Sequence, residues 1–213
     1  MNIEALVSIF TIIDGKFKIL LFRKKKDPYK GYWILPSDLL GKENTLEEVV
    51  EDCITTKVGL SNLEYDQVGA FSELDRNPSK RIVGIAFFSI VDSTTIELSG
   101  VETDEGMQWF DIDNLPKIGY DHQQIIKATV EELKNKINHS LALKKLFPSD
   151  FTLPEIQKIY EQILGVELDR RNFRKKFVKA DLIEETGDKV TGMNGRPATL
   201  YRFREDIEDI MLF

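Results

Sequence analysis

A short segment near the C-terminus concentrates side chains of the types that proteins use to contact nucleic acids. The segment Arg170–Ala180 carries six basic residues and no acidic one. Arginines are the usual readers of guanine, and the amide of Asn172 is of the type that pairs with adenine edges. Phe173 and Phe177 are four residues apart, so on a helix they share an inward face and leave the cations largely towards solvent. The candidate DNA contacts here are Arg170, Arg171, Asn172, Arg174, Lys175 and Lys179.

The segment ahead of it predicts a helix that would support the basic one. Thr152 followed by Glu155 is a capping-box pattern, and it opens a predicted helix over Leu153–Leu164. Gly165 ends that helix, and a short turn leads to the basic segment. A lone basic helix is most often a solvated surface, but a capped apolar helix directly before it favours DNA binding.

A ribbon follows the basic segment. Leu182-Ile183 and Leu200–Phe203 can pair as strands on either side of a predicted loop, Glu184–Thr199. Lys189 and Arg196 lie in this loop, where we expect them to hold phosphates or to enter a minor groove. Helix, turn, basic helix and two-stranded ribbon is the layout of a winged helix-turn-helix.

The overall charge, taken alone, argues against nucleic acid as a partner. The chain has 213 residues with 29 basic and 36 acidic side chains, a formal net charge of −7. Residues 1–147 hold 18 basic and 23 acidic side chains, and residues 148–213 hold 11 and 13, so both parts are acidic. The six clustered cations are a local exception, and we expect the bulk acidity to discourage indiscriminate DNA binding.

The composition excludes several classes of protein. With 42% hydrophobic residues and 13 Phe, the chain has the apolar material for a packed core rather than extended disorder. No apolar run approaches the roughly 20 residues that a membrane span needs, and the start lacks the basic flank of a signal peptide. A single cysteine, Cys53, allows neither an internal disulfide nor a multi-thiolate zinc site. We therefore expect a cytoplasmic protein.

The N-terminal part reads as strands around one helix, closed by a second helix. Asp14-Gly15 is a strong hairpin signal between two β-rich runs, Ala5–Ile13 and Phe17–Phe22. Thr45–Val58 has the periodicity of an amphipathic helix. The further expected elements are strands at Tyr32–Leu35, Gln67–Leu74, Ile82–Val91 and Gly106–Asp111 and a helix at about His122–Ile137.

The predicted helix over Thr45–Val58 has one apolar and one acidic face. Thr45 can act as its N-cap and Gly59 as its stop. Cys53 belongs to the apolar stripe, and no histidine is near it in sequence, so we expect a core thiol rather than a nucleophile. The acidic residues, for which we expect a solvated surface, are Glu47, Glu48, Glu51 and Asp52.

Gly31–Leu39 and Asn44–Leu60 resemble the core of a Nudix domain, an α/β/α sandwich. That family's signature is a Gly, five residues, Glu, seven residues, Arg-Glu, an apolar residue, any residue, Glu-Glu, any residue, Gly and an apolar residue. Aligned on Gly59-Leu60, this sequence keeps the spacing of the signature but has other residues at its catalytic and metal-binding positions. The replacements are Asp38 for the first Gly, Asn44 for the first Glu, Asp52-Cys53 for Arg-Glu and Thr56-Lys57 for the metal-binding Glu-Glu.

These replacements argue against catalysis. Nudix hydrolysis needs carboxylates that converge on magnesium or manganese. Cys53, Thr56 and Lys57 offer no hard anionic oxygen, and Lys57 would put a positive charge where the cation should sit. The sequence therefore predicts no metal site, no cofactor and no hydrolase activity at this position.

Over the rest of the chain the sequence resembles the Nudix-related transcriptional regulators. The resemblance implies a degenerate Nudix-like sandwich at residues 1–147 that senses an effector, followed by a small winged helix-turn-helix domain at residues 148–213. It further implies a bacterial homodimer, either repressor or activator, for which we expect a palindromic DNA operator. The matching segments are Asp75–Arg81, Tyr120–His122, Leu146–Pro148, Phe151–Gln157, Arg171–Lys175 and Arg196–Phe203.

Six residues are candidates for the effector site: Trp33, Asp75, Arg76, Arg81, Asp121 and His122. The two arginines beside Asp75 can offer a fork for phosphate or sugar hydroxyls. Asp121-His122 stands at a helix start, where backbone N–H groups face an anion or a hydroxylated ligand. Trp33 can stack on a ring. Each also has a plain structural interpretation. Trp33 can be a core residue, Arg81 can form a salt bridge at a strand end, and His122 can cap the helix.

The effector and two other functions stay open. By resemblance, members of the family sense ADP-ribose or sugars such as arabinose, and loss of both metal-binding glutamates favours a metal-independent sugar or sugar phosphate. The first alternative is a Nudix-type pyrophosphohydrolase acting on a nucleoside diphosphate derivative, which would depend on Glu47 or Glu51. The second is a protein-interaction module built on an inert Nudix scaffold.

Overall fold

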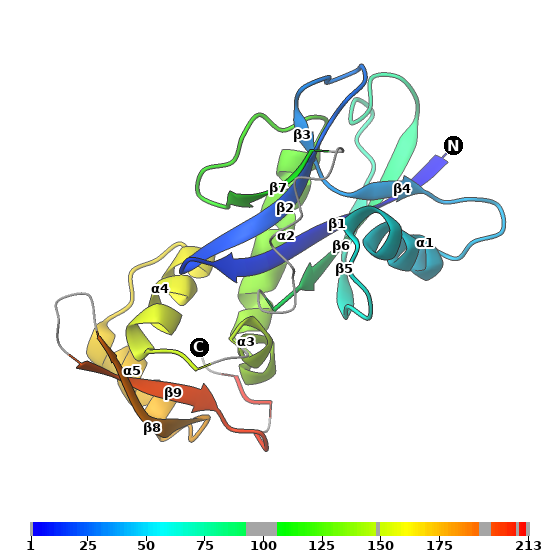
Figure 1. Cartoon of the computed structure of the whole chain (residues 1–213). Helices are drawn as coiled ribbons and strands as arrows, with labels where there is room; N and C mark the ends of the chain where they lie inside the picture. Colours follow the sequence, from blue (N-terminus) through cyan, green and yellow to red (C-terminus); the bar gives the residue numbers. More distant parts are fainter. Residues whose placement is uncertain (1, 93–105, 148–149, 192–196, 208, 212–213) are drawn as a thin grey trace. The chain divides into compact units, whose positions relative to one another are not determined.

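The computed structural model describes residues 2–92, 106–147, 150–191, 197–207 and 209–211 (Figure 1). The chain divides into two compact units. The first comprises Met1–Thr11 and Lys18–Glu132, and the second comprises Ile12–Phe17 and Leu133–Phe213. Among the described helices, none is long and apolar enough to cross a membrane.

A seven-stranded mixed sheet forms the centre of the first unit. The hydrogen-bonded order is β3 (Trp33–Ile34), β2 (Lys16–Arg23), β1 (Asn2–Ile13), β6 (Ile82–Ile90) and β5 (Tyr65–Phe71). β1 and β6 run parallel, with Asn2 opposite Ile82 and Phe10 opposite Ile90. Two short strands join antiparallel: β4 (Ser37–Leu39) pairs with β1, and β7 (Met107–Asp111) pairs with β2.

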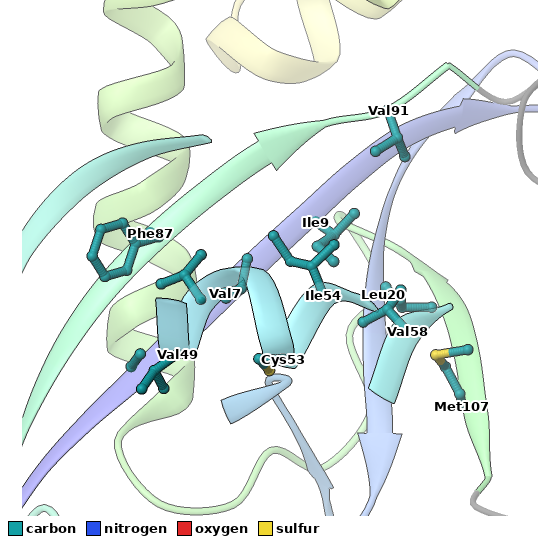
Figure 2. Packing of buried hydrophobic residues seen from close by; sticks show 12 residues of the cluster. Val7, Ile9, Leu20, Val49, Cys53, Ile54, Val58, Phe87, Val91 and Met107 are labelled. Atoms are coloured by element: carbon teal, nitrogen blue, oxygen red, sulfur yellow. The ribbon is translucent and has the colours of Figure 1, made fainter. Parts of the chain in front are cut away.

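Helices cover both faces of this sheet. Ala5–Thr11 is buried without a break, as expected for a central strand covered on both sides. Val7 and Ile9 pack in the same cluster as the helix that follows β4 (Figure 2). Ser8 points to the opposite side, where its hydroxyl lies 3.4 Å from that of Thr129 on α2 (His122–Ile137). The first unit is therefore an α/β/α sandwich, which confirms the expected fold class.

The predicted helix over Thr45–Val58 forms in two parts. Thr45 caps α1 (Leu46–Asp52) through a capping box with Glu48, and Gly59, at φ +78°, ends the π-helix η1 (Cys53–Val58). The hydroxyls of Thr55 and Thr56 donate to carbonyls four residues back, which competes with the α-helical backbone bonds and accounts for the wider winding. The predicted solvated face is confirmed, because all four of its acidic residues are exposed.

The second unit holds three helices and a two-stranded antiparallel sheet. They are α3 (Ser140–Leu146), α4 (Leu153–Leu164), α5 (Arg170–Lys179), β8 (Ile183–Thr191) and β9 (Pro197–Phe203). Phe151 adds a bridge to β9, where its backbone N–H and C=O both bond to Tyr201 at 2.8 Å. The order of helix, turn, helix and ribbon confirms the winged helix-turn-helix expected from the sequence.

The ribbon is longer than the sequence predicted. We expected a loop over Glu184–Thr199, but β8 extends to Thr191 and pairs with β9 as far as Pro197. The register shifts between Glu185 and Lys189, around Gly187 at φ +88°. The irregularity accommodates Gly187, one residue of the predicted loop, because one strand can bulge while its ladder continues on either side.

Gly84 offers a test of packing in the first unit. A Cβ there would lie 2.7 Å from Nη2 of buried Arg76 and 2.8 Å from Cδ1 of buried Leu6. We expect Gly84→Ala to lower the free energy of unfolding by roughly 1–3 kcal/mol, because neither neighbour has room to move. Urea unfolding followed by tryptophan fluorescence reads this unit alone, since both tryptophans, Trp33 and Trp109, belong to it.

Gly41→Ala is the matched control. Its Cβ would also meet an atom at 2.7 Å, but that atom is the Oδ1 of the exposed Asn44 side chain, which can rotate away. We expect a change within about 0.5 kcal/mol. Equal unfolding midpoints for the two variants would show that Arg76 and Leu6 do not enclose Gly84.

Candidate functional site

The apolar face of α5 fixes the direction of its cations. Phe173 and Phe177 are buried, and their ring centroids lie 5.6 and 6.0 Å from that of Tyr160 on α4. Asp169 caps the helix, because its carboxylate accepts a hydrogen bond from the backbone N–H of Asn172 at 2.9 Å. With one face packed and the N-terminus capped, the opposite face of α5 meets solvent.

All six predicted DNA contacts on α5 lie at the surface. Their side chains are exposed, and α5 contains no acidic residue. Val178, 53% exposed, adds an apolar group to the same surface. The set is Arg170, Arg171, Asn172, Arg174, Lys175 and Lys179.

A groove of about 460 Å³ separates this helix from the ribbon. Arg171, Arg174 and Lys175 line one side, and Glu185 and Tyr201 lie on the other. The phenol of Tyr201 donates to Glu185 Oε1 at 3.2 Å. Burial, followed by Glu185, raises the pKa of this phenol, while Arg174 acts in the opposite sense. The groove is therefore bordered by cations on α5 and, on the ribbon, by a neutral phenol and the acidic side chain of Glu185.

The structure describes only one of the two DNA contacts predicted after α5. Lys189 is exposed on β8, opposite Thr199 of β9. Arg196 lies outside the described residues. For all eight DNA-contact candidates, contact with DNA stays a prediction.

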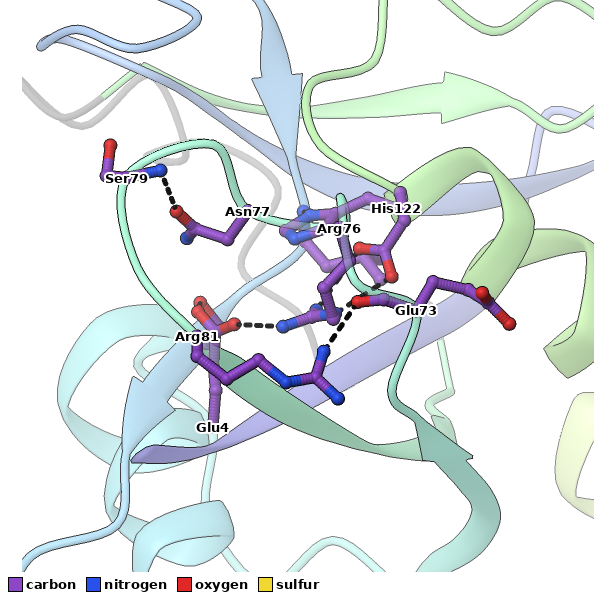
Figure 3. Close-up of polar contacts among 10 residues, drawn as sticks. Glu4, Glu73, Arg76, Asn77, Ser79, Arg81 and His122 are labelled. Carbon is purple, nitrogen blue, oxygen red and sulfur yellow. Dashed lines mark hydrogen bonds and ion pairs between the residues drawn. The ribbon is translucent and has the colours of Figure 1, made fainter. Parts of the chain in front are cut away.

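In the first unit, Arg76 is buried in an ion-pair network (Figure 3). Its Nε and Nη2 donate to the two carboxylate oxygens of Asp121 at 2.9 and 3.1 Å, and Nη1 lies 3.3 Å from Glu4 Oε2. These bonds tie the loop after β5 to β1 and to the start of α2. The geometry favours a structural role for Arg76 and Asp121, and their predicted role as ligand contacts has no support from it.

His122 is buried beside this network and holds another segment. Its Nδ1 accepts a hydrogen bond from the backbone N–H of Leu35 at 2.9 Å. Burial, helped by the nearby Arg76 and Lys24, lowers the pKa of His122 to about 3. The imidazole is therefore neutral with its proton on Nε2, and it acts as a fixed acceptor for the chain at Leu35.

The other three effector candidates lie at or near the surface. Trp33 is half-buried, with its ring edge-on to Phe110 at 4.5 Å. Arg81 is exposed and donates to the backbone carbonyl of Glu73 at 2.9 Å, and Asp75 is exposed. The structure thus groups Arg76, Asp121 and His122 and leaves Trp33 outside that group.

A cationic pocket of about 250 Å³ in the first unit escaped the sequence analysis. Four of its lining residues are basic: Arg23, Lys24, Lys25 and Lys57. Leu35–Ser37 forms another part of its wall, but none of the six predicted effector residues lines it. The only signal in the sequence is the run of four basic residues Arg23–Lys26, which begins at the last residue of β2.

Tyrosine rings cluster near one of these cations. Lys24 Nζ lies 6.0 Å from the ring centroid of Tyr120, which is 4.7 Å from that of Tyr29. Tyr29 and Tyr120 have φ values of 69° and 56°, a region that bulky residues seldom adopt. Such strained positions are frequent at ligand sites.

The residues at the Nudix metal positions do not fit a divalent cation. Burial raises the pKa of the Cys53 thiol to about 12, so Cys53 offers no thiolate at neutral pH. Thr56 donates its hydroxyl proton to the carbonyl of Asp52, and Lys57 brings an ammonium. Within the described residues, no group of three His, Cys, Asp or Glu side chains could hold a metal.

Known proteins resemble both parts of the chain. Residues 144–203 match the model of the NrtR DNA-binding winged helix domain. The chain is 29% identical to an ADPR responsive transcriptional repressor, NtrR, of Acinetobacter baylyi over 92% of this chain and 80% of that protein. It is 35% identical to an ADP-ribose pyrophosphatase of Methanocaldococcus jannaschii over 57% of this chain and 70% of that protein.

Solved structures agree with these sequence matches. Shewanella oneidensis NrtR complexed with a 27mer DNA is similar at a TM-score of 0.76 and 26% identity, over 96% of this chain and 94% of that chain. The NUDIX domain of the same protein, complexed with ADP ribose, shares the fold at a TM-score of 0.53 and 19% identity, over 62% and 87% of the two chains. The chain combines a sandwich that keeps the Nudix scaffold with a winged helix of the NrtR type, and the similarity extends over both parts. It therefore belongs to the Nudix-related transcriptional regulators.

Proposed function

We propose that this protein binds operator DNA through its winged helix and responds to an ADP-ribose-like ligand that it does not hydrolyse. The observation that carries the proposal is the exposed cationic face of α5, which lies inside the segment that matches the NrtR DNA-binding domain. The six surface residues of α5, with Lys189 of β8 and with Arg196, which lies outside the described residues, are the proposed DNA contacts.

The charge of the pocket supports a phosphorylated effector. A neutral sugar would leave Arg23, Lys24, Lys25 and Lys57 without an anionic partner in the ligand, whereas a diphosphate matches them. The tyrosine rings near Lys24 suit a nucleobase. Two relatives are named for ADP-ribose, one as a repressor that responds to it and one as a pyrophosphatase. The lost glutamates had favoured a sugar or a sugar phosphate. The charge argues against the neutral sugar, and the two relatives lead us to prefer an ADP-ribose-like ligand to the sugar phosphate.

The proposal includes an assembly and a place of action. A homodimer on a palindromic operator would present two recognition helices to successive half-sites about one helical turn, roughly 34–36 Å, apart. We keep Phe147 as the proposed boundary between the sensing domain and the DNA-binding domain. A regulator of this kind would act in the bacterial cytoplasm.

One observation favours a second function, hydrolysis of ADP-ribose. The relative with 35% identity is an ADP-ribose pyrophosphatase. Against it stand the residues at the metal positions, because Cys53, Thr56 and Lys57 supply no carboxylate. Glu47 and Glu51 remain on α1, but both are exposed, and Glu51 accepts a hydrogen bond from the Tyr65 hydroxyl.

Removing two cations from α5 should weaken DNA binding. We expect Arg171→Ala with Arg174→Ala to cost at least about tenfold in affinity for a duplex that the protein selects from a random pool, since each base or phosphate contact is worth roughly 1–3 kcal/mol. Fluorescence anisotropy over a range of salt concentrations measures both the affinity and its salt slope, which should fall by roughly one for each lost phosphate contact.

The control removes the same charge elsewhere. Lys80 and Lys127 are exposed in the first unit, and Lys80→Ala with Lys127→Ala should leave the affinity within about twofold. If the two double variants weakened binding equally, the protein would be responding to total charge and α5 would not be the recognition helix.

The effector assignment predicts a ligand-dependent change in DNA binding. ADP-ribose should change the affinity for the selected duplex at least about fivefold, the lower end of typical allosteric coupling, and arabinose and ribose should not. Anisotropy titrations with each compound measure this. A response to arabinose alone would restore the sugar alternative.

The inert site predicts no hydrolysis. Incubation with ADP-ribose and millimolar magnesium should release no AMP above the rate without protein, as measured by chromatography, because the carboxylates that hold the catalytic metal are replaced. Release of AMP that is lost in Glu47→Gln or Glu51→Gln would instead establish the pyrophosphohydrolase.

A further inference from the structure

Two residues that replace Nudix signature residues meet in this structure. Lys57 stands at one of the metal-binding glutamates and Asp38 at the first glycine, nineteen residues apart in sequence. The Lys57 ammonium lies 3.0 Å from Asp38 Oδ2 and donates to the carbonyl of Ser37 at 2.6 Å. Lys57 stands where the signature has a carboxylate, and Asp38 supplies a carboxylate where the signature has a glycine. The two replacements belong together, because oxygen atoms of β4 hold the Lys57 ammonium of η1.

Two oxygen atoms of the kinds that bind a hard metal ion, a carboxylate oxygen and a carbonyl oxygen, hold this ammonium. Besides Asp38 and the Ser37 carbonyl, the carboxylate of Glu4 approaches the site, where Oε1 accepts from the Ser37 hydroxyl at 2.9 Å. Glu4 and Asp38 are both close enough to Cys53 to raise the pKa of its thiol, while Lys57 lowers it. Carboxylate and carbonyl oxygens are also the ligands of magnesium in proteins.

The same ammonium reaches the cationic pocket. Lys57 lines it together with Ser37 and the basic run Arg23–Lys25. Its side chain is 37% exposed, so it remains open to a ligand. An ammonium carries three N–H donors, and Ser37 and Asp38 take two of them, which leaves one for an anionic oxygen.

We propose that the Lys57 ammonium replaces the divalent cation, so that the pocket binds the diphosphate of a nucleotide-like ligand without magnesium. This inference rests on the proposed function and deepens it, because it names the group that receives the phosphates. Arg23, Lys24 and Lys25 supply the remaining positive charge. Their contacts with the ligand are charge-assisted hydrogen bonds, which need no metal.

Calorimetric titration with the full chain tests the metal requirement. ADP-ribose should bind with the same Kd, within about twofold, in EDTA and in millimolar magnesium. Lys57→Met should weaken binding tenfold to a hundredfold in EDTA, since it removes a charged hydrogen-bond donor. Lys42→Met, an exposed lysine outside the pocket lining, is the matched control and should bind as the parent does.

A second variant exchanges the built-in cation for a metal ligand. Lys57→Glu places a carboxylate next to Asp38 and Glu4, so binding should fail in EDTA and return in magnesium. Circular dichroism checks that each variant is folded. Magnesium-dependent binding by the parent chain, or full affinity of Lys57→Met in EDTA, would overturn the proposal.

Inorganic pyrophosphate separates this inference from the proposed function. If pyrophosphate binds in EDTA and needs Lys57 while ADP-ribose neither binds nor alters DNA binding, the cation replacement stands and the ADP-ribose effector falls. If ADP-ribose alters DNA binding only with magnesium, the effector stands and the replacement is wrong. If neither compound binds under either condition, both proposals are wrong.

Discussion

The first unit depends on one buried positive charge. The guanidinium of Arg76 is taken out of water and paired with Asp121 and Glu4, and breaking a buried pair of this kind typically costs about 3–5 kcal/mol. Gly84 leaves the space that the guanidinium fills. His122 follows Asp121 in the chain, and its neutral ring accepts a hydrogen bond from the backbone N–H of Leu35. This bond holds Leu35 in the pocket wall. A network that does not line the pocket therefore determines where part of its wall lies.

The fold of the sandwich and the chemistry of the ancestral site are separable. α1 and η1 keep their place through an apolar stripe, with Val49, Val50 and Ile54 packed against the sheet, and through caps at Thr45 and Gly59. None of these features requires the glutamates of the Nudix signature. Where one of them is replaced by Cys53, the new side chain joins the buried cluster. Thr56 and Lys57 lie outside that cluster, so these two positions can change without loss of core packing.

Features set by local signals could be predicted, and features set by distant partners could not. The hairpin at Asp14-Gly15 and both capped helices follow from turn and cap residues a few positions apart. β4 is three residues long and exists because β1 offers it a partner, which no local pattern reveals. The same limit applies to the site: a buried arginine, and an ammonium paired nineteen residues away, look like any other cations in a sequence.

Both candidate sites are groups of cations in a chain whose net charge is −7. At physiological ionic strength, charges on a surface are screened beyond roughly 8 Å. A phosphate at α5 therefore interacts with the cations of that helix far more than with carboxylates elsewhere, and the same holds for a phosphate beside Arg23–Lys25. The acidic remainder of the chain repels polyanions wherever such a group is absent. Net acidity and phosphate recognition are thus compatible, because affinity depends on how many cations share one screening length and not on the sum over the chain.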